Sequence, residues 1–320
     1  MASLQKSMRR PSHIGWLLGA GCLLMAGLDL LSGHGLHIPE TDILLKLRLP
    51  RMLTALTAGA ALGLSGAQMQ ALFRNPLADP HLMGVSGGAG LGAAIAALTV
   101  TSAGVAGGLP MVAAAFVGAM AAGMAIVAVS ARTQSTGTLL VVGVMLGFVM
   151  SAVSSILQYE AGEESLKLFY SWMAGSFSGV RYSGLGLMAA ALAAGLVLAL
   201  SQLKQLDLIL FGETFAAFSG ASLRGLRWRT MLGCALMTGA VTAFCGPIGF
   251  VGIAAPHLAR KVLGTNVHRK VLPGAMAAGA ALALAGDVLS HLGPRPLPVG
   301  STLALVGIPL IIAFLWRSRL

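Results

Sequence analysis

The sequence predicts an all-α integral membrane protein, and its composition supports this fold class in two ways. Of the 320 residues, 56% are hydrophobic and only 10% are charged, with a mean hydropathy of +0.84. About a quarter of the residues in soluble domains are charged, and a membrane-spanning helix needs about 20 mostly apolar residues. The chain has room for ten such helices, so we expect one transmembrane domain over residues 1–320.

Proline, glycine and polar residues mark the limits of the apolar segments, because proline opposes helix continuation and glycine permits sharp turns. The ten expected spans are 14–34, 49–73, 84–102, 109–131, 138–159, 183–203, 230–247, 253–264, 271–291 and 299–316. Residues 160–182 are too polar to span and include an aromatic patch, so we expect a helix lying at the outer membrane interface.

The 43 glycines predict closely packed helices, because small residues let helix backbones approach one another in lipid. Each repeat of two glycines four residues apart is a weak signal, and packing within one chain is its simplest interpretation. The repeats are Gly59–Gly63, Gly84–Gly88, Gly88–Gly92 and Gly143–Gly147.

The distribution of lysine and arginine predicts the orientation. If ten spans start from a cytoplasmic N-terminus, both termini are cytoplasmic, and fifteen of the 21 cations fall on the inner side against six outside. Arg48, Arg51 and Arg295 are exceptions that gather on the outer face. A basic rim there suits docking of an acidic soluble partner, and contact with lipid headgroups is the alternative.

Residues 204–229 interrupt the apolar sequence with a short, strongly basic segment. Within it, Glu213, Ala216, Ala217 and Gly220 have a spacing that suits a short helix, a turn and a second helix. Small residues also allow another protein to approach closely. We interpret this loop as the part that receives a mechanical push from a soluble partner, with a plain connecting loop as the alternative.

Several chemistries have no support in the sequence. There is no phosphate-binding Gly-x-x-x-x-Gly-Lys-[Ser/Thr] loop, so the chain does not itself hydrolyse ATP. The histidines lack metal-ligand spacing, and His257 is interpreted as structural. Asp29 and Asp287 are the acidic residues expected inside spans, which makes them functional candidates. However, Asp287 is close to Ser290 and His291 and could be satisfied locally.

A set of short motifs gives a more specific indication. They are Arg48-Leu-Pro-Arg51, Ser65-Gly66-x-x-x-Gln70, Arg74-Asn-Pro-Leu-Ala-x-Pro80, Gly84-x-Ser-Gly-Gly-Ala89, Gly246-Pro-Ile-Gly-Phe-Val-Gly252, Pro256-His257-x-x-Arg260 and Leu297-Pro-Val-Gly300. In this order and spacing, they resemble the permease family of type II ATP-binding-cassette (ABC) importers for iron-siderophore, haem and vitamin B12. The resemblance covers nearly the whole chain.

The resemblance implies a homodimer of ten-helix subunits in the bacterial inner membrane, with the transport pathway on the two-fold axis. It also implies two ATPase subunits inside, which hold the ATP and Mg, and a periplasmic binding protein outside. The chain itself would bind no cofactor, metal or nucleic acid and would not be an enzyme.

The resemblance also assigns roles to individual residues. Residues 206–225 correspond to the coupling helices, with Glu213, Ala216, Ala217 and Gly220 at the ATPase groove. The binding protein would dock at Arg48, Arg51 and Arg295. The turn 132–138 and the helix after it correspond to a gate, for which the candidates are Ser135, Thr136 and Thr138. Gly87 departs from the family, which often carries a polar residue there, so a second gate at that position is in doubt.

The cargo implied by the resemblance is an iron chelate, either haem or a ferric siderophore, with vitamin B12 as the alternative. Arg181, expected at the outer mouth, could contact the propionates of haem or an anionic siderophore, and it could equally anchor a lipid headgroup. This slightly favours haem. A secondary transporter and a membrane scaffold are the competing functions. The shortage of intramembrane acids disfavours the first of these.

Overall fold

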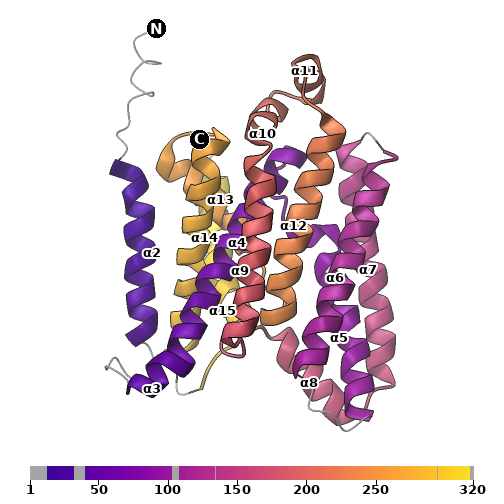
Figure 1. Cartoon of the computed structure of the whole chain (residues 1–320), viewed down its shortest axis with the longest axis vertical. Coiled ribbons are helices and arrows are strands. Elements are labelled where there is room, and N and C mark those ends of the chain that lie inside the picture. Colours follow the sequence, from indigo (N-terminus) through magenta and orange to yellow (C-terminus); the bar gives the residue numbers. More distant parts are fainter. Residues whose placement is uncertain (1–12, 32–39, 103–107, 134, 294, 318–320) are drawn as a thin grey trace.

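The computed structural model describes residues 13–31, 40–102, 108–133, 135–293 and 295–317, and all regular structure in these ranges is helical. Both chain termini, which we expect to be cytoplasmic, lie outside the described residues. Figure 1 shows the long helices running side by side along one direction.

The longer elements are α2 (His13–Leu31), α4 (Leu49–Phe73), α5 (Val85–Ser102), α6 (Gly108–Ser130), α7 (Thr136–Tyr159), α8 (Glu163–Met173), α9 (Tyr182–Leu200), α12 (Leu223–Cys245), α13 (Val251–Leu263), α14 (His268–Ser290) and α15 (Val299–Arg317). The shorter elements are α3 (Thr41–Ile43), the π-helix η1 (Leu44–Arg48), the 3₁₀-helix η2 (Pro80–Met83), α10 (Leu203–Ile209) and α11 (Glu213–Phe218). Helices α10 and α11 lie at one end of the molecule, and α3 and α8 lie at the other (Figure 1).

A helix occupies each of the ten expected segments, but these helices differ in character. Among the described residues, α6, α7, α9 and α14 are long and apolar enough to cross a membrane. Helix α4 is at the centre and packs against α14, α13, α12 and α9. Nearly all of its residues from Pro50 to Leu72 are buried. A helix surrounded by protein is stabilised by close contact with its neighbours, which small side chains permit. Helix α4 therefore carries many glycines and alanines.

Close contact between backbones holds α4 in place. A Cβ atom built on Gly59 would lie 2.3 Å from the carbonyl oxygen of Gly279, and one on Gly63 would lie 2.2 Å from that of Ala275. Both partners belong to α14. On Gly66 a Cβ would lie only 1.8 Å from the carbonyl oxygen of Gly252. Glycine is therefore required at these crossings, and this repeat packs within the chain.

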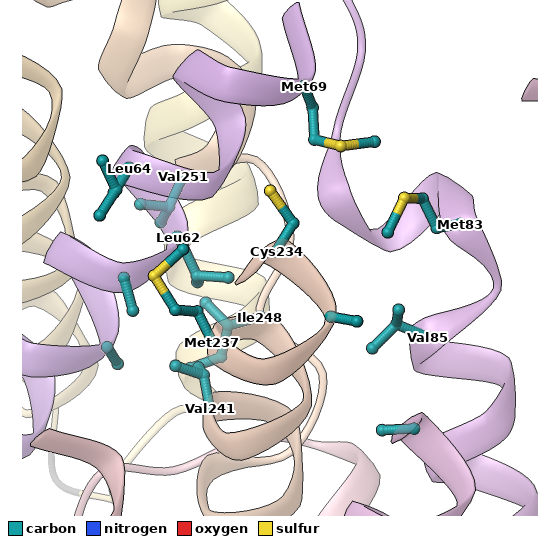
Figure 2. Packing of buried hydrophobic residues seen from close by; sticks show 14 of the residues in the cluster. Leu62, Leu64, Met69, Met83, Val85, Cys234, Met237, Val241, Ile248 and Val251 are labelled. Carbon is teal, nitrogen blue, oxygen red and sulfur yellow. The ribbon is translucent and has the colours of Figure 1, made fainter. Parts of the chain in front are cut away.

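Side chains fill the space between α4 and α12, as Figure 2 shows. Leu62 of α4 lies beside Met237 of α12, and Leu64 lies beside Val251 of α13, all of them buried. The Cys234 thiol donates to the Ser65 carbonyl at 3.5 Å. This interface joins the central helix to the helix that follows the loop 204–229.

The other glycine repeats also form crossings within the chain. A Cβ on Gly88 would lie 2.3 Å from the Gly118 carbonyl oxygen, which brings α5 against α6. One on Gly87 would lie 2.9 Å from the Gly147 carbonyl oxygen, and Gly84 also contacts α7. A larger residue at position 87 would push α7 away. Gly87 is therefore a packing position in this chain.

The segment 160–182 differs from the expectation in extent and setting. Its helix, α8, covers only Glu163–Met173, and the chain then turns at Gly175. Phe169 is buried, and the Trp172 indole donates to the Ala243 carbonyl at 3.1 Å. These two aromatic side chains pack on the protein, because a backbone carbonyl at the end of α12 offers the indole a partner. Tyr170 remains exposed.

Replacing Gly66 with alanine should destabilise the protein, because the new methyl group would collide with the Gly252 carbonyl and separate α4 from α13. We expect the free energy of unfolding to fall by about 2 kcal/mol, measured by unfolding in mixed detergent micelles. Gly186→Ala on α9 is the matched control, since no atom lies within 4 Å of its Cβ position. The control should be neutral or slightly stabilising. Equal stability of both variants would contradict the role given to this crossing.

Candidate coupling and gating site

The loop 204–229 folds into two short helices before α12 begins. Helix α11 starts at Glu213, directly after Gly212 with a φ of +111°, and it ends in a turn at Gly220 with a φ of +83°. Both backbone conformations favour glycine. The expected order of short helix, turn and second helix is therefore present as α11, the turn at Gly220 and α12.

Helix α10 is attached to the rest of the protein through Asp207, a residue within the helix. The Asp207 carboxylate accepts hydrogen bonds from the backbone N–H of His268 at 2.8 Å and from its Nδ1 at 2.7 Å. A carboxylate at the first residue of a helix satisfies a free N–H and interacts favourably with the helix dipole. Asp207 thus connects α10 to the start of α14.

Helix α11 is connected to a different part of the molecule through Arg227. The Nη2 of Arg227 lies 2.9 Å from the Glu213 carboxylate, and its Nη1 donates to the Thr133 carbonyl at 3.2 Å. Arg227 is only 6% exposed. A planar guanidinium can hold two acceptors in fixed directions. One buried side chain therefore links the proposed coupling helix to the turn that precedes α7.

Two of the candidate gate residues share a cleft with the coupling helix. Ser135 caps the first turn of α7, where its hydroxyl accepts a hydrogen bond from the Thr138 N–H at 3.2 Å. An open cleft of about 710 Å³ is lined by Ser135, Thr136 and Glu213 together with Arg74. Thr138 is exposed in that first turn and does not line the cleft.

The exposed surface of the coupling helix is aromatic, which we did not predict from the sequence. Phe211, Phe215 and Phe218 are 74%, 51% and 89% exposed. Phe211 lies just before α11, and Phe215 and Phe218 lie three residues apart within it, a spacing that places side chains on one helix face and could have revealed this. Ala217 is also exposed, whereas Ala216 is fully buried. The expectation that both alanines contact a partner is therefore corrected: Ala216 packs on the body of the protein.

Motifs far apart in the sequence meet near the same end of α4. The Arg260 guanidinium donates to the Gln70 side-chain oxygen at 2.6 Å, and the Gln70 amide donates to the Ile253 carbonyl at 3.2 Å. His257 lies 2.8 Å from the Pro76 carbonyl oxygen. These contacts agree with the structural interpretation of His257.

At the opposite end, the burial of Arg51 corrects one part of the predicted docking rim, and docking at Arg48 stays a prediction. Arg51 is buried, with its Nε 2.7 Å from the Asp287 carboxylate and its Nη2 3.3 Å from that of Asp29. Arg48 is half-buried and donates to the Leu30 carbonyl at 2.8 Å. The two arginines are three residues apart and so share the helix face toward α2. They fasten α2 to α4 and α14.

Arg295 and Arg181 remain exposed on that end of the molecule. Arg181 immediately precedes α9, and the neighbouring Tyr182 hydroxyl donates to the Leu45 carbonyl at 2.7 Å. The loop between α8 and α9 lies beside the one between α14 and α15, since the Val299 N–H donates to the Gly175 carbonyl at 3.3 Å. Within the described part of the chain, two exposed cationic side chains are therefore present on adjoining loops.

A closely packed multi-helix membrane body with short helices attached at one end defines the chain as a transporter permease. Comparison with known proteins identifies it further: residues 21–317 match the FecCD transport family, and the chain belongs to that family. It is a permease of a type II ABC importer, not an enzyme, and ATP hydrolysis resides on a separate subunit. The resemblance inferred from the motifs is thereby confirmed.

The chain is similar to two curated permeases over most of its length. It is 38% identical over 318 residues to the vitamin B12 import system permease protein BtuC of Klebsiella pneumoniae, covering 95% of this chain and 94% of that protein. It is 35% identical over 287 residues to the hemin transport system permease protein HmuU of Yersinia pestis, covering 87% and 84%.

The fold is also similar to a solved structure described as an inward-facing conformation of a putative metal-chelate type ABC transporter. The TM-score is 0.87 at 28% sequence identity, covering 96% of this chain and all of that one. This similarity agrees with the family assignment.

Removing the charge of Arg51 should destabilise the protein strongly, because Asp29 and Asp287 would remain buried without their cation. We expect Arg51→Met to lower the free energy of unfolding by about 3–5 kcal/mol, measured by detergent-induced unfolding. Adding Asp29→Asn and Asp287→Asn should restore much of the loss. Arg48→Met is the control, and its effect should be near 1 kcal/mol. Wild-type stability of Arg51→Met would contradict the fastening role.

Proposed function

We propose that two copies of this chain form the inner-membrane pathway of an importer that carries a metal-centred tetrapyrrole, haem or vitamin B12, into the cytoplasm. Two ATPase subunits would act at the α10–α11 end, and a periplasmic binding protein would deliver the cargo at the α3–α8 end. The names of the two curated relatives support this cargo class. The two relatives are similarly identical to this chain, at 38% and 35%, so haem and vitamin B12 both stay in the proposal as cargo.

One observation carries the mechanism: Arg227 contacts both Glu213 on α11 and the Thr133 carbonyl in the turn before α7. When the ATPase subunits close on ATP, they would displace α11 against the body. The guanidinium would transfer that displacement to the turn and so to Ser135 and Thr136. Rigid-body movement of packed helices is a common way to open a cavity to one side at a time.

The setting of α7 suits a moving gate. Of its 24 residues, Leu139, Gly143 and Ser154 are buried, and most of the others are partly or largely exposed. The exposed apolar residues include Val141, Met145 and Phe148. We propose that a second copy of the chain covers part of this face at the two-fold axis and that lipid covers the rest.

The outer end retains two candidate contacts for the delivery step. Arg295 would pair with an acidic residue of the binding protein, and Arg181 would meet a carboxylate of the cargo at the mouth. Exposed charges chiefly accelerate association. Arg51 has no direct part in this proposal, because its guanidinium group is engaged within the chain, and docking at Arg48 stays a prediction.

The ion pairs of Arg51 also disfavour the ion-gradient alternative. A secondary transporter usually needs an acidic residue that lines a site near the middle of the membrane. Asp29 and Asp287 are buried beside the same guanidinium, with exposures of 1% and 0%. In this proposal the two acids hold the Arg51 guanidinium and take no part in proton transport.

The proposal is tested by uptake into proteoliposomes that contain the permease, its ATPase subunits and the binding protein. We expect uptake of hemin or cyanocobalamin that requires internal ATP and is insensitive to a protonophore. Uptake driven by a proton gradient without ATP would overturn the mechanism. Uptake of a ferric siderophore in place of both tetrapyrroles would overturn the cargo assignment.

The role of Arg227 gives a separate prediction. Arg227→Met should lower ATP-driven uptake about tenfold while ATP hydrolysis stays within about twofold, because the push on α11 would no longer reach Thr133. A cysteine at Ser135 should then lose any nucleotide dependence of its crosslinking across the dimer. Arg269→Met, which removes an exposed cation at the start of α14, is the control and should transport normally.

A charge swap separates coupling from simple stability. In the double variant Glu213→Arg with Arg227→Glu, the ion pair can form again, but a glutamate cannot donate to the Thr133 carbonyl. We expect the swap to restore thermal stability without restoring uptake. Normal uptake by the swapped protein would show that the bond to Thr133 has no part in transmission.

A further inference from the structure

A second open groove lies between α6 and α12, apart from the cleft of the coupling site. It is formed by the last turn of α6, around Ala128, and by the first turns of α12, and Arg224, Trp228 and Arg229 line it. Its volume is about 530 Å³. Trp228 is 46% exposed. The transport mechanism described above uses none of these side chains.

The groove opens because the two helices are closest in their middle. A Cβ on Gly123 of α6 would lie 2.5 Å from the Cβ of Ala235 on α12, and one on Gly239 would lie 3.2 Å from that of Ala119. Farther toward the end of α6, the large side chains at the start of α12 replace these small contacts. The groove is therefore a fixed feature of the crossing between the two helices.

The charges in the groove are not balanced within the chain. Among the described residues, neither Arg224 nor Arg229 has an ion pair or a side-chain hydrogen bond, and no acidic residue lines the groove. By contrast, the neighbouring Arg227 is paired with Glu213. Two cations beside an apolar helix end and an indole form a site suited to an anion that carries an apolar tail.

We propose that this groove binds the headgroup of an anionic phospholipid. The phosphate lies between Arg224 and Arg229, and an acyl chain follows the apolar side of α6 around Val127 and Ala128. Trp228 lies at the level of the glycerol backbone, the depth at which tryptophan is enriched in membrane proteins. Basic pockets between transmembrane helices are a known form of lipid recognition.

The ATPase subunit is the competing occupant, and the geometry favours lipid. At about 100° per residue along α12, Trp228 lies about 40° from Arg224, and Arg229 lies about 100° beyond Trp228. Arg227 lies about 60° from Arg224 in the other direction, where it pairs with Glu213. The groove shares no lining residue with the cleft beside α11, where the ATPase would act. Its other wall is the end of an apolar helix that is long enough to cross the membrane.

Lipid retention by the purified full-length chain tests the proposal. Delipidated protein is incubated with limiting phosphatidylglycerol or phosphatidylcholine, and native mass spectrometry counts the lipids that remain bound. We expect wild-type protein to retain phosphatidylglycerol preferentially. In Arg224→Gln with Arg229→Gln, that occupancy should fall about tenfold. Quenching of tryptophan fluorescence by brominated phosphatidylglycerol should also weaken in Trp228→Phe.

The matched control is Arg269→Gln with Lys270→Gln, which removes two exposed charges at the start of α14. It should retain lipid like the wild type. Equal loss in both double variants, or no loss in the groove variant, would overturn the proposal. So would displacement of the lipid by inorganic phosphate alone, which would indicate a bare phosphate site. Normal lipid retention with weaker ATPase binding would reassign the groove to protein docking. None of these readouts depends on the proposed cargo.

Discussion

The structure depends on backbone-to-backbone contact along the central helix α4. Lipid tails are as apolar as leucine, so helices in a membrane gain little from burying large apolar side chains against one another. They gain from dispersion contacts at short range, which need glycine or alanine at the crossing. Gly59, Gly63 and Gly66 provide such contacts to α14 and α13. A body held in this way moves in rigid pieces, because a small displacement would break many contacts together.

That rigidity gives the peripheral contacts their importance. Helix α7 is held near its middle by contacts of Gly143 and Gly147 with the segment around Gly84 and Gly87. Three residues before α7 begins, the chain is held by the bond from Arg227 to the Thr133 carbonyl. A helix restrained at one crossing and pulled at one end tilts about that crossing. In the mechanism that we propose, the short helices would therefore drive a gate without any deformation of the central helices.

The sequence was sufficient for much of the fold, because helix limits follow local signals. Expected and observed limits of α4 are the same at 49–73, where an early proline begins the helix and Arg74 adopts a left-handed conformation at its end. Hydropathy was less informative for the central helices. Helix α4 contacts other helices on most sides and few of its side chains face lipid, so its sequence does not need high hydropathy.

The candidate site was predictable only where its residues are close in sequence. Glu213 and Gly220 belong to one short motif, but the partners of Glu213 and Arg51 do not. Arg51 meets Asp29 and Asp287 from 22 and 236 positions away, and no spacing pattern relates them. The same applies to Thr133 and Arg227, because one member of that pair is a backbone carbonyl. Charge on a presumed outer face was therefore a poor guide to exposure.

The choice of arginine at the buried positions has a geometric explanation. Arg51 contacts two carboxylates, and Arg227 contacts one carboxylate and one carbonyl. A lysine is a single point charge on a flexible chain and would not hold two acceptors in fixed directions. Each buried arginine thus fixes the relative position of the segments that bear its partners. An exposed arginine has no such internal task. Among the described residues, Arg181, Arg224 and Arg295 are exposed and Arg229 is half-buried without an ion pair, so these cations are available to bind other molecules.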